Sequence, residues 1–171
     1  MLYTRLLFSG SIARFPVEAY EQLRTRAAGL SADDQSLDAA RLRGMGFSHR
    51  DWMEADNRRE LHRHGWRQLF AEFDAVVRPI TPTPAFPHDH NPTLEERRID
   101  SDGVEYPYFD QLVWAGLATM PGLPATAIPA GRSPEGLPVG VQLIGPMFED
   151  RTPLRLVELL KQKIGGFQAP K

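Results

Sequence analysis

The stretch from Gly136 to Pro146 reads GLPVGVQLIGP, and it decides the architecture of the last third of the chain. Aliphatic and β-branched residues dominate Leu137 to Ile144, which predicts a strand. The four residues before it, Ser133 to Gly136, place a proline early in a turn and end on a glycine that can adopt a positive φ. A second apolar run, Ala125 to Ala130, precedes this turn. The two runs therefore predict an antiparallel β-hairpin.

Helical patterns lie on both sides of this hairpin. Ser48 followed by Asp51 resembles a capping box and predicts the start of the longest helix. Proline at the first position and glycine past the end delimit other helices. The expected helices cover residues 16–29, 37–43, 48–73, 106–118 and 152–164, and a short buried strand covers 75–77. The alternation predicts an α/β fold, with a mixed sheet that contains an antiparallel hairpin and is flanked by helices.

The remaining segments include a predicted loop and a predicted surface segment. Residues 81–92 are rich in proline, which predicts an extended loop. Residues 94–103 carry many charges and are expected to form an excursion on the surface. The first ten residues hold only a short apolar run at Leu6 to Phe8, without the apolar core or cleavage site of a secretory signal.

Composition excludes several classes of protein. The chain has 171 residues, a formal net charge of −2 and no cysteine. A balanced charge does not indicate a nucleic-acid or lipid partner, and the lack of thiols excludes disulfide scaffolds and zinc–thiolate sites. No apolar run is long enough for a membrane span. We therefore expect a cytoplasmic protein of one domain over residues 1–171, with no membrane, nucleic acid, metal or cofactor.

Several motifs together resemble a known family. FDAVVRP at Phe73–Pro79 is followed by TPTPA at Thr81–Ala85, and GLPA at Gly122–Ala125 leads to PAG at Pro129–Gly131. With the hairpin of Gly136–Pro146, this order is similar to the C-terminal portion of amidase signature hydrolases. The resemblance implies that the chain is the C-terminal part of an α/β/α fold.

The resemblance also implies a chemistry. Amidase signature enzymes hydrolyse carboxylic amide C–N bonds with two serines and a lysine, and the serines come from a loop rich in glycine and serine. No such loop occurs in these residues; only Ser9-Gly10-Ser11 faintly suggests one, and no lysine is near it in sequence. The sequence therefore predicts no catalytic residues here and a truncated or partial amidase, a fragment inactive alone. A small-molecule amide would bind only with the missing N-terminal part.

Two residues are predicted to bind substrate. An acidic residue near the position of Asp110 contacts the substrate in family members that act on small amides, and Trp114 could line an acyl pocket. Both residues also have a structural interpretation: Asp110 as an exposed carboxylate in the first turn of a helix, and Trp114 as core.

Other hypotheses stay open. The chain could be a noncatalytic binding protein that keeps the substrate-lining wall, or it could associate with a partner or with itself through exposed sheet edges. A hydrolase based on histidine is the third hypothesis, with His62 as acid or base, although a buried His62 bonded to a carbonyl is the structural alternative. The run His88-Asp89-His90 and the pair His62 and His64 are potential metal ligands, but the run is expected to form a polar loop tip.

Overall fold

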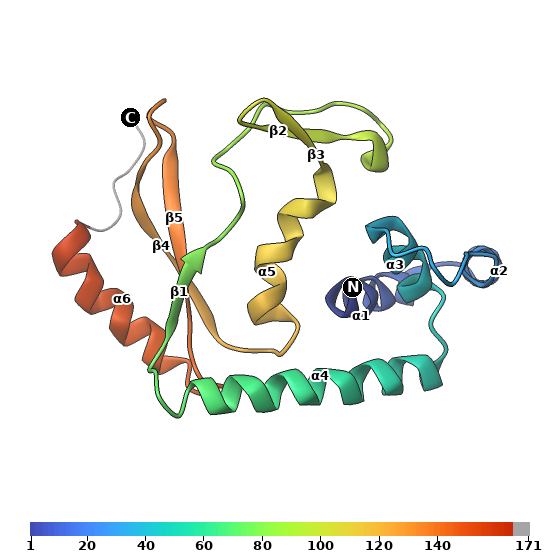
Figure 1. Ribbon diagram of the computed structural model, residues 1–171, viewed down its shortest axis with the longest axis horizontal. Coiled ribbons are helices and arrows are strands. Elements are labelled where there is room, and N and C mark those ends of the chain that lie inside the picture. The colour runs from blue at the N-terminus through green and yellow to red at the C-terminus, as the bar shows by residue number, and fades with distance from the viewer. Residues whose placement is uncertain (166–171) are drawn as a thin grey trace. The chain divides into compact units, whose positions relative to one another are not determined.

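The computed structural model describes residues 1–165, and these form two compact units. The first unit is Met1–His64, and the second begins at Gly65. The boundary falls inside the longest helix, α4, which spans His49–Leu69 (Figure 1). Each unit has its own set of contacts. The single domain expected from the sequence stays a prediction.

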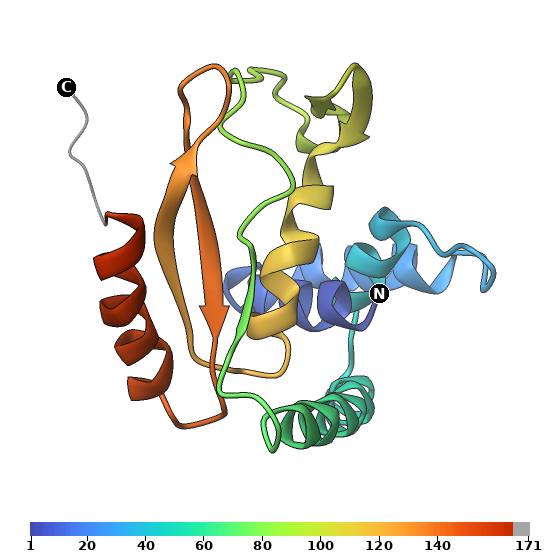
Figure 2. The same ribbon diagram turned by 60° about the vertical axis from the view of Figure 1, so that its left-hand side comes forward.

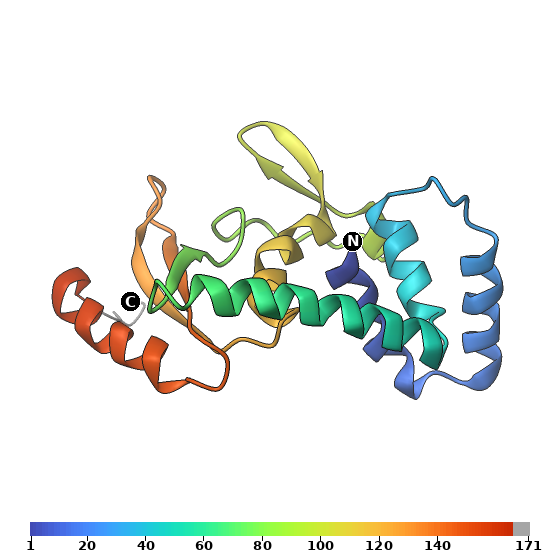
Figure 3. The same cartoon turned by 60° about the horizontal axis from the view of Figure 1, so that its bottom comes forward.

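The first unit is entirely helical. Close contacts join α3 to α1 and α3 to α2, and three small residues of α3 are buried: Ala39, Ala40 and Gly44. A Cβ atom on Gly44 would lie 2.4 Å from the carbonyl oxygen of Arg5. Glycine is therefore needed where α3 meets α1. The elements are α1 Leu2–Ser11, η1 Ile12–Arg14, α2 Val17–Ala28, α3 Leu37–Met45 and α4, shown in Figure 3.

Helix α1 was not predicted from the sequence, whereas α2 and α3 lie where their patterns placed them. The end of α1 reads Ser9-Gly10-Ser11, which suggested a flexible loop. In the structure the hydroxyls of Ser9 and Ser11 each donate a 2.7 Å hydrogen bond to the carbonyl three residues earlier. The packing of α1 on α3 overrides the low helix propensity of the segment.

The second unit is built on a three-stranded antiparallel sheet. Its strands are β1 Val76–Pro79, β4 Ala125–Arg132 and β5 Pro138–Ile144, in the order β1-β5-β4. The sheet lies between α5 (Leu112–Thr119) on one side and α6 (Arg151–Ile164) on the other, as Figures 1 and 2 show. The predicted hairpin is confirmed: its register pairs Ala125 with Ile144, and Gly136 closes the turn with a φ of +85°.

The two faces of the sheet carry separate apolar layers. Ile144 is fully buried and packs with Ala118 of α5 and with Leu123. Half-buried apolar residues complete this layer: Trp66, Phe70, Val76 and Met147. The neighbouring Leu143 is also fully buried and, by the alternation of a strand, points to the opposite face. The sheet therefore has one layer under α5 and another on the side of α6.

The charged segment before α5 is more regular than the sequence suggested. Residues Arg98–Ser101 and Val104–Pro107 form β2 and β3, a second antiparallel hairpin that follows η2 (Leu94–Glu96). Asp102 and Gly103 occupy the turn with φ of +56° and +77°, the conformation that Asp-Gly favours between strands. The segment is mostly exposed, as its charges indicated, but its hairpin was not predicted from the sequence.

Helix α4 also ends earlier than predicted. The sequence pattern extended it to Phe73, but the helix stops at Leu69, and the Phe73 side chain is 56% exposed. Its start is as expected, because the Ser48 hydroxyl accepts a hydrogen bond from the Asp51 amide while the Asp51 carboxylate accepts one from the Ser48 amide. None of the helices in the described residues combines the length and apolarity needed to cross a membrane.

Candidate functional site

The two residues predicted to bind substrate lie on one continuous helical stretch. Asp110 belongs to η3 (Tyr108–Gln111), which passes directly into α5, where Trp114 stands in the first turn. The junction residue Leu112 has helical φ and ψ values of −74° and −15°. Both side chains are half-buried. The structure therefore places Asp110 and Trp114 four residues apart on one helical stretch.

Trp114 covers an arginine of the sheet. The guanidinium carbon of Arg78 lies 5.1 Å from the centre of the Trp114 ring, within the range of a cation–π interaction. Arg78 is in the middle of β1, where its side chain shares the α5 face with Val76. It is the charged residue of the described core, with only 6% of its surface exposed.

The guanidinium of Arg78 is incompletely satisfied. Its Nε–H donates to the carbonyl of Pro79 at 3.2 Å. The two terminal nitrogens, Nη1 and Nη2, are buried and have no hydrogen-bond acceptor among residues 1–165. Burial lowers the pKa of Arg78 from its ordinary value. An arginine nevertheless stays protonated in a protein, so this side chain is a buried positive charge.

Gln142 stands directly across from Arg78. The two residues are register partners in the β1–β5 pair, so their side chains are neighbours on the same face of the sheet. The Gln142 Oε1 atom is also buried without a partner among the described residues. On the next strand, Ala127 pairs with Gln142 and is exposed, as is Ala125. Arg78 and Gln142 therefore lie beside an exposed part of the sheet that is formed by small residues.

Arg78 and Gln142 were part of the motifs quoted from the sequence, but no role was predicted for either. A signal was available for Arg78, because a charge in the middle of a short apolar strand must meet a partner or a polar site once it is buried. No comparable signal identifies Gln142. Its place beside Arg78 follows from strand pairing, which the sequence does not specify.

Most of the described serines form local hydrogen bonds through their hydroxyls. The Ser36 hydroxyl caps α3 by accepting from the Ala39 amide at 3.1 Å, and the Ser133 hydroxyl accepts from Leu137 in the hairpin turn. The Ser48 hydroxyl donates to the Asp51 carboxylate at 2.6 Å. Lys161 and Lys163 are exposed in the last turn of α6. Lys171 lies outside the described residues.

The histidines do not support the histidine-based hypotheses. His62 is exposed on α4, so the interpretation of His62 as a buried, carbonyl-bonded residue was wrong. The rings of His88 and His90 lie 6.0 Å apart, but the carboxylate of Asp89 between them accepts hydrogen bonds from the amides of Asn91 and Arg98. Within residues 1–165 no group of three or more histidine, aspartate or glutamate side chains is arranged to hold a metal ion.

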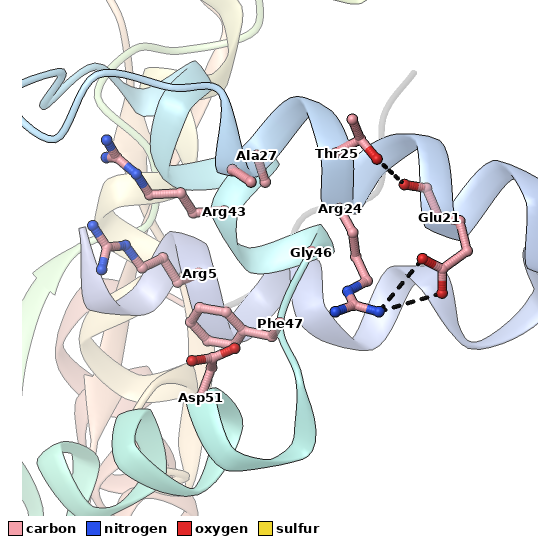
Figure 4. Close-up of a pocket in the computed structure, with 10 residues that line it drawn as sticks. Arg5, Glu21, Arg24, Thr25, Ala27, Arg43, Gly46, Phe47 and Asp51 are labelled. Atoms are coloured by element: carbon pink, nitrogen blue, oxygen red, sulfur yellow. Dashed lines mark hydrogen bonds and ion pairs between the residues drawn. The ribbon is translucent and has the colours of Figure 1, made fainter.

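The helical unit has a pocket of its own. Its volume is about 560 Å³, and Figure 4 shows arginine side chains from three helices around it. Arg24 pairs with Glu21 at 3.3 Å, and the Arg43 guanidinium donates 2.6 Å bonds to the carbonyls of Ser31 and Asp34. Arg5 has a pKa lowered first by burial and then by the like charges of other arginines. The pocket is thus lined mainly by groups that stabilise the helices.

Together, the sheet, its hairpin and the Arg78–Trp114 pair define a class of protein: an α/β protein that presents polar and aromatic groups on one face of an antiparallel sheet. A protein-family model described as "Amidase" matches residues 17–154 of the chain. The chain therefore belongs to the amidase family, as its motifs indicated.

Curated relatives agree with this assignment. The chain is 32% identical over 156 residues to the A subunit of glutamyl-tRNA(Gln) amidotransferase from Bartonella bacilliformis, and 34% identical over 156 residues to that from Xanthobacter autotrophicus. In both cases 91% of this chain is matched. The chain spans only 30% of the length of these relatives.

A solved structure shows the same fold. The crystal structure of an amidase superposes with a TM-score of 0.65 and 26% identity, covering 96% of this chain and 35% of the amidase. The α/β architecture with an antiparallel hairpin and flanking helices, expected from the sequence, is therefore the architecture of the C-terminal portion of an amidase.

Proposed function

We propose that these residues form the noncatalytic portion of an amidase that hydrolyses carboxylic amide C–N bonds. In this proposal the face that carries Asp110 and Trp114 is a substrate-lining wall. The serine–lysine centre of the reaction is supplied by a further polypeptide segment, outside residues 1–171. The proposal rests on the family match over residues 17–154. It also rests on the local hydrogen bonds of the serine hydroxyls and on the exposure of the lysines to solvent.

The chemistry of a serine nucleophile supports this division of roles. Such a serine needs a base within hydrogen-bond reach and donors for the oxyanion. The hydroxyls of Ser9, Ser11 and Ser48 instead donate to neighbouring carbonyls or to a carboxylate. Lys161 and Lys163 are exposed to water, where a lysine has little tendency to act as a base.

Helix α5 supports association with another polypeptide segment. Its sequence, LVWAGLAT, contains no charged residue. While Ala118 is buried in the layer under α5, Val113 and Leu117 are 58% and 43% exposed. A helix that is apolar on all sides is normally buried, so we infer that another segment covers this outer face. The structure that fits is the remainder of an amidase fold, since this chain matches only 30% of the length of its relatives.

The first experiment is labelling of the purified native chain with a fluorophosphonate serine probe, with an intact amidase as positive control. We expect no specific label while the control reacts. A labelled serine whose reactivity disappears on denaturation would overturn the proposal, and the labelled peptide would identify the nucleophile.

The second experiment tests whether α5 is an interface. The double variant Val113→Lys, Leu117→Lys is compared with the wild type by sedimentation velocity over a range of concentrations. We expect the wild-type chain to associate and the variant to remain monomeric. A matched variant, Leu154→Lys, alters a 52% exposed leucine of α6 and should behave as the wild type. Equal association of all three chains would exclude α5 as the interface.

A further inference from the structure

Arg78 is a buried cation that no described residue neutralises. Its side chain is 6% exposed, and both terminal nitrogens lack an acceptor within residues 1–165. Removing a charge from water without a partner is costly, and buried charges in proteins are normally paired. Trp114 offsets part of this cost by lying 5.1 Å from the guanidinium, but an aromatic ring accepts no strong hydrogen bond. The group that completes the site therefore has to come from elsewhere.

The geometry of the unsatisfied group selects the chemistry of its partner. The guanidinium is a planar fork whose parallel N–H groups match the two oxygens of a carboxylate. A single arginine carries one positive charge, which a carboxylate balances and a phosphate dianion exceeds. The neighbouring Gln142 adds a neutral amide that can turn its NH₂ toward an anion. A monocarboxylate therefore satisfies the two terminal nitrogens of Arg78 and can also accept from the Gln142 NH₂.

The surroundings offer a route to Arg78. Gln142 lies between Arg78 on β1 and Ala127 on β4, and Ala125 and Ala127 are both exposed on that face. Because these side chains are small, the surface of the sheet beside Arg78 and Gln142 is accessible. Trp114 is half-buried and its ring packs against the guanidinium.

We propose that Arg78 binds the carboxylate of a small ligand, with Trp114 as its cover and Gln142 as a second polar contact. This binding goes beyond the proposed function, because it requires no hydrolysis. It can therefore be measured on the chain by itself, and its failure would leave the fluorophosphonate result unaffected.

The direct test is a titration with sodium benzoate at constant ionic strength, followed by NMR signals of the Arg78 Nε–H and the Trp114 indole N–H. Benzamide has the same ring without the charge and is the control ligand. We expect saturable shifts of both signals with benzoate and none with benzamide. Arg78→Met should abolish the response, and Arg78→Lys should weaken it about tenfold or more, since lysine keeps the charge but loses the fork.

Thermal unfolding provides a second test, which does not depend on how well a variant binds the ligand. Without carboxylate, Arg78→Met should raise the midpoint of thermal unfolding, because it removes a buried unpaired charge. Benzoate should then raise the midpoint of the wild type, and of the exposed control Arg151→Met, but not that of Arg78→Met.

Three results would overturn the proposal. One is a benzoate response shared equally by the wild type and Arg78→Met, which would mean adventitious binding. Another is the absence of any saturable shift in the wild type. The third is a lower unfolding midpoint for Arg78→Met without ligand, which would show that Arg78 is already paired inside the chain, with Gln142 as the nearest acceptor.

Discussion

The helical unit and the sheet unit achieve close packing in different ways. The largest fully buried side chains of the described residues, among them Leu143 and Ile144, all belong to the sheet unit. In the helical unit the buried positions of α3 are Ala39, Ala40 and Gly44. The sheet unit thus depends on apolar volume, whereas the helical unit depends on short distances between backbones. The two units should therefore respond to opposite kinds of substitution.

Removing volume from the sheet unit should have the largest effect. Leu143→Ala deletes a side chain with no exposed surface, and such a cavity typically costs about 2–5 kcal/mol of unfolding free energy. Denaturant unfolding measures the loss, and hydrogen exchange should place it after Gly65. The control Leu154→Ala changes a 52% exposed leucine and should cost less than about 0.5 kcal/mol. Similar losses for both variants would contradict a core centred on Leu143.

Adding volume to the helical unit should have the next largest effect. In Gly44→Ala the new Cβ would meet the Arg5 backbone at 2.4–2.9 Å, and overpacking of this kind costs about 1–3 kcal/mol. Hydrogen exchange should become faster in residues 1–64. The matched control is Gly65→Ala in α4, where a Cβ meets nothing within 4 Å and should stabilise the helix by about 0.5–1 kcal/mol. Unchanged exchange in α1 and α3 would refute the close approach.

Loss of a helix cap should have a smaller effect. The Ser36 hydroxyl accepts the Ala39 amide at the start of α3, and removing such a cap costs about 1 kcal/mol. Ser36→Ala should lower the unfolding free energy by that amount in denaturant titrations. Ser11→Ala removes an exposed hydroxyl at the end of α1 and should be close to neutral. A cap that contributes nothing would leave the two variants equally stable.

The smallest effect should be electrostatic and local. Hydrogen bonds from Ser48 lower the pKa of the Asp51 carboxyl, and bonds from Ser36 lower that of Asp34. A carboxyl whose pKa is lowered by folding stabilises the protein above its unfolded pKa, and this contribution is lost as the pH falls through the folded value.

NMR titration of the carboxyl groups tests this assignment. In Ser48→Ala the pKa of Asp51 should rise toward its ordinary value while that of Asp34 stays unchanged. In Ser36→Ala the pKa of Asp34 should rise less, because the bond from the Ser36 amide, its larger cause, is kept, and the pKa of Asp51 should stay unchanged. A shift of both groups in either variant would point to a change in the whole helical unit rather than the loss of one pair of bonds.

Prediction from the sequence succeeded best where structure is local. The hairpin of Ala125–Ile144, the capping pair Ser48–Asp51 and the end of α6 at Gly165 depend on contacts between residues close in the chain. It failed for α1, which depends on packing against α3, and for the β2–β3 hairpin, where charged residues hid an Asp-Gly turn and the buried Ile99. In both cases the composition of the segment did not indicate the contacts that form the element.

The residues of the candidate site also fall into two groups, those named from the sequence and those found only in the structure. Asp110 and Trp114 were named from the sequence through a family resemblance, and their role as a substrate-lining wall stays a prediction. Arg78 and Gln142 were not named. Their significance arises because strand pairing places them together and because α5 places Trp114 over the guanidinium.

The sequence by itself determined the turns, the caps, the strand and helix patterns, and membership of the amidase family, because each depends on residue types at short or fixed spacing. Only the tertiary structure decided which residues meet across the sheet and which charge is buried. Burial of Arg78 depends on elements far apart in the chain, and a low-dielectric site exists only once they have packed. For that reason the sequence could only point to a charge beside apolar residues, and the folded protein was needed to show that its guanidinium is unsatisfied.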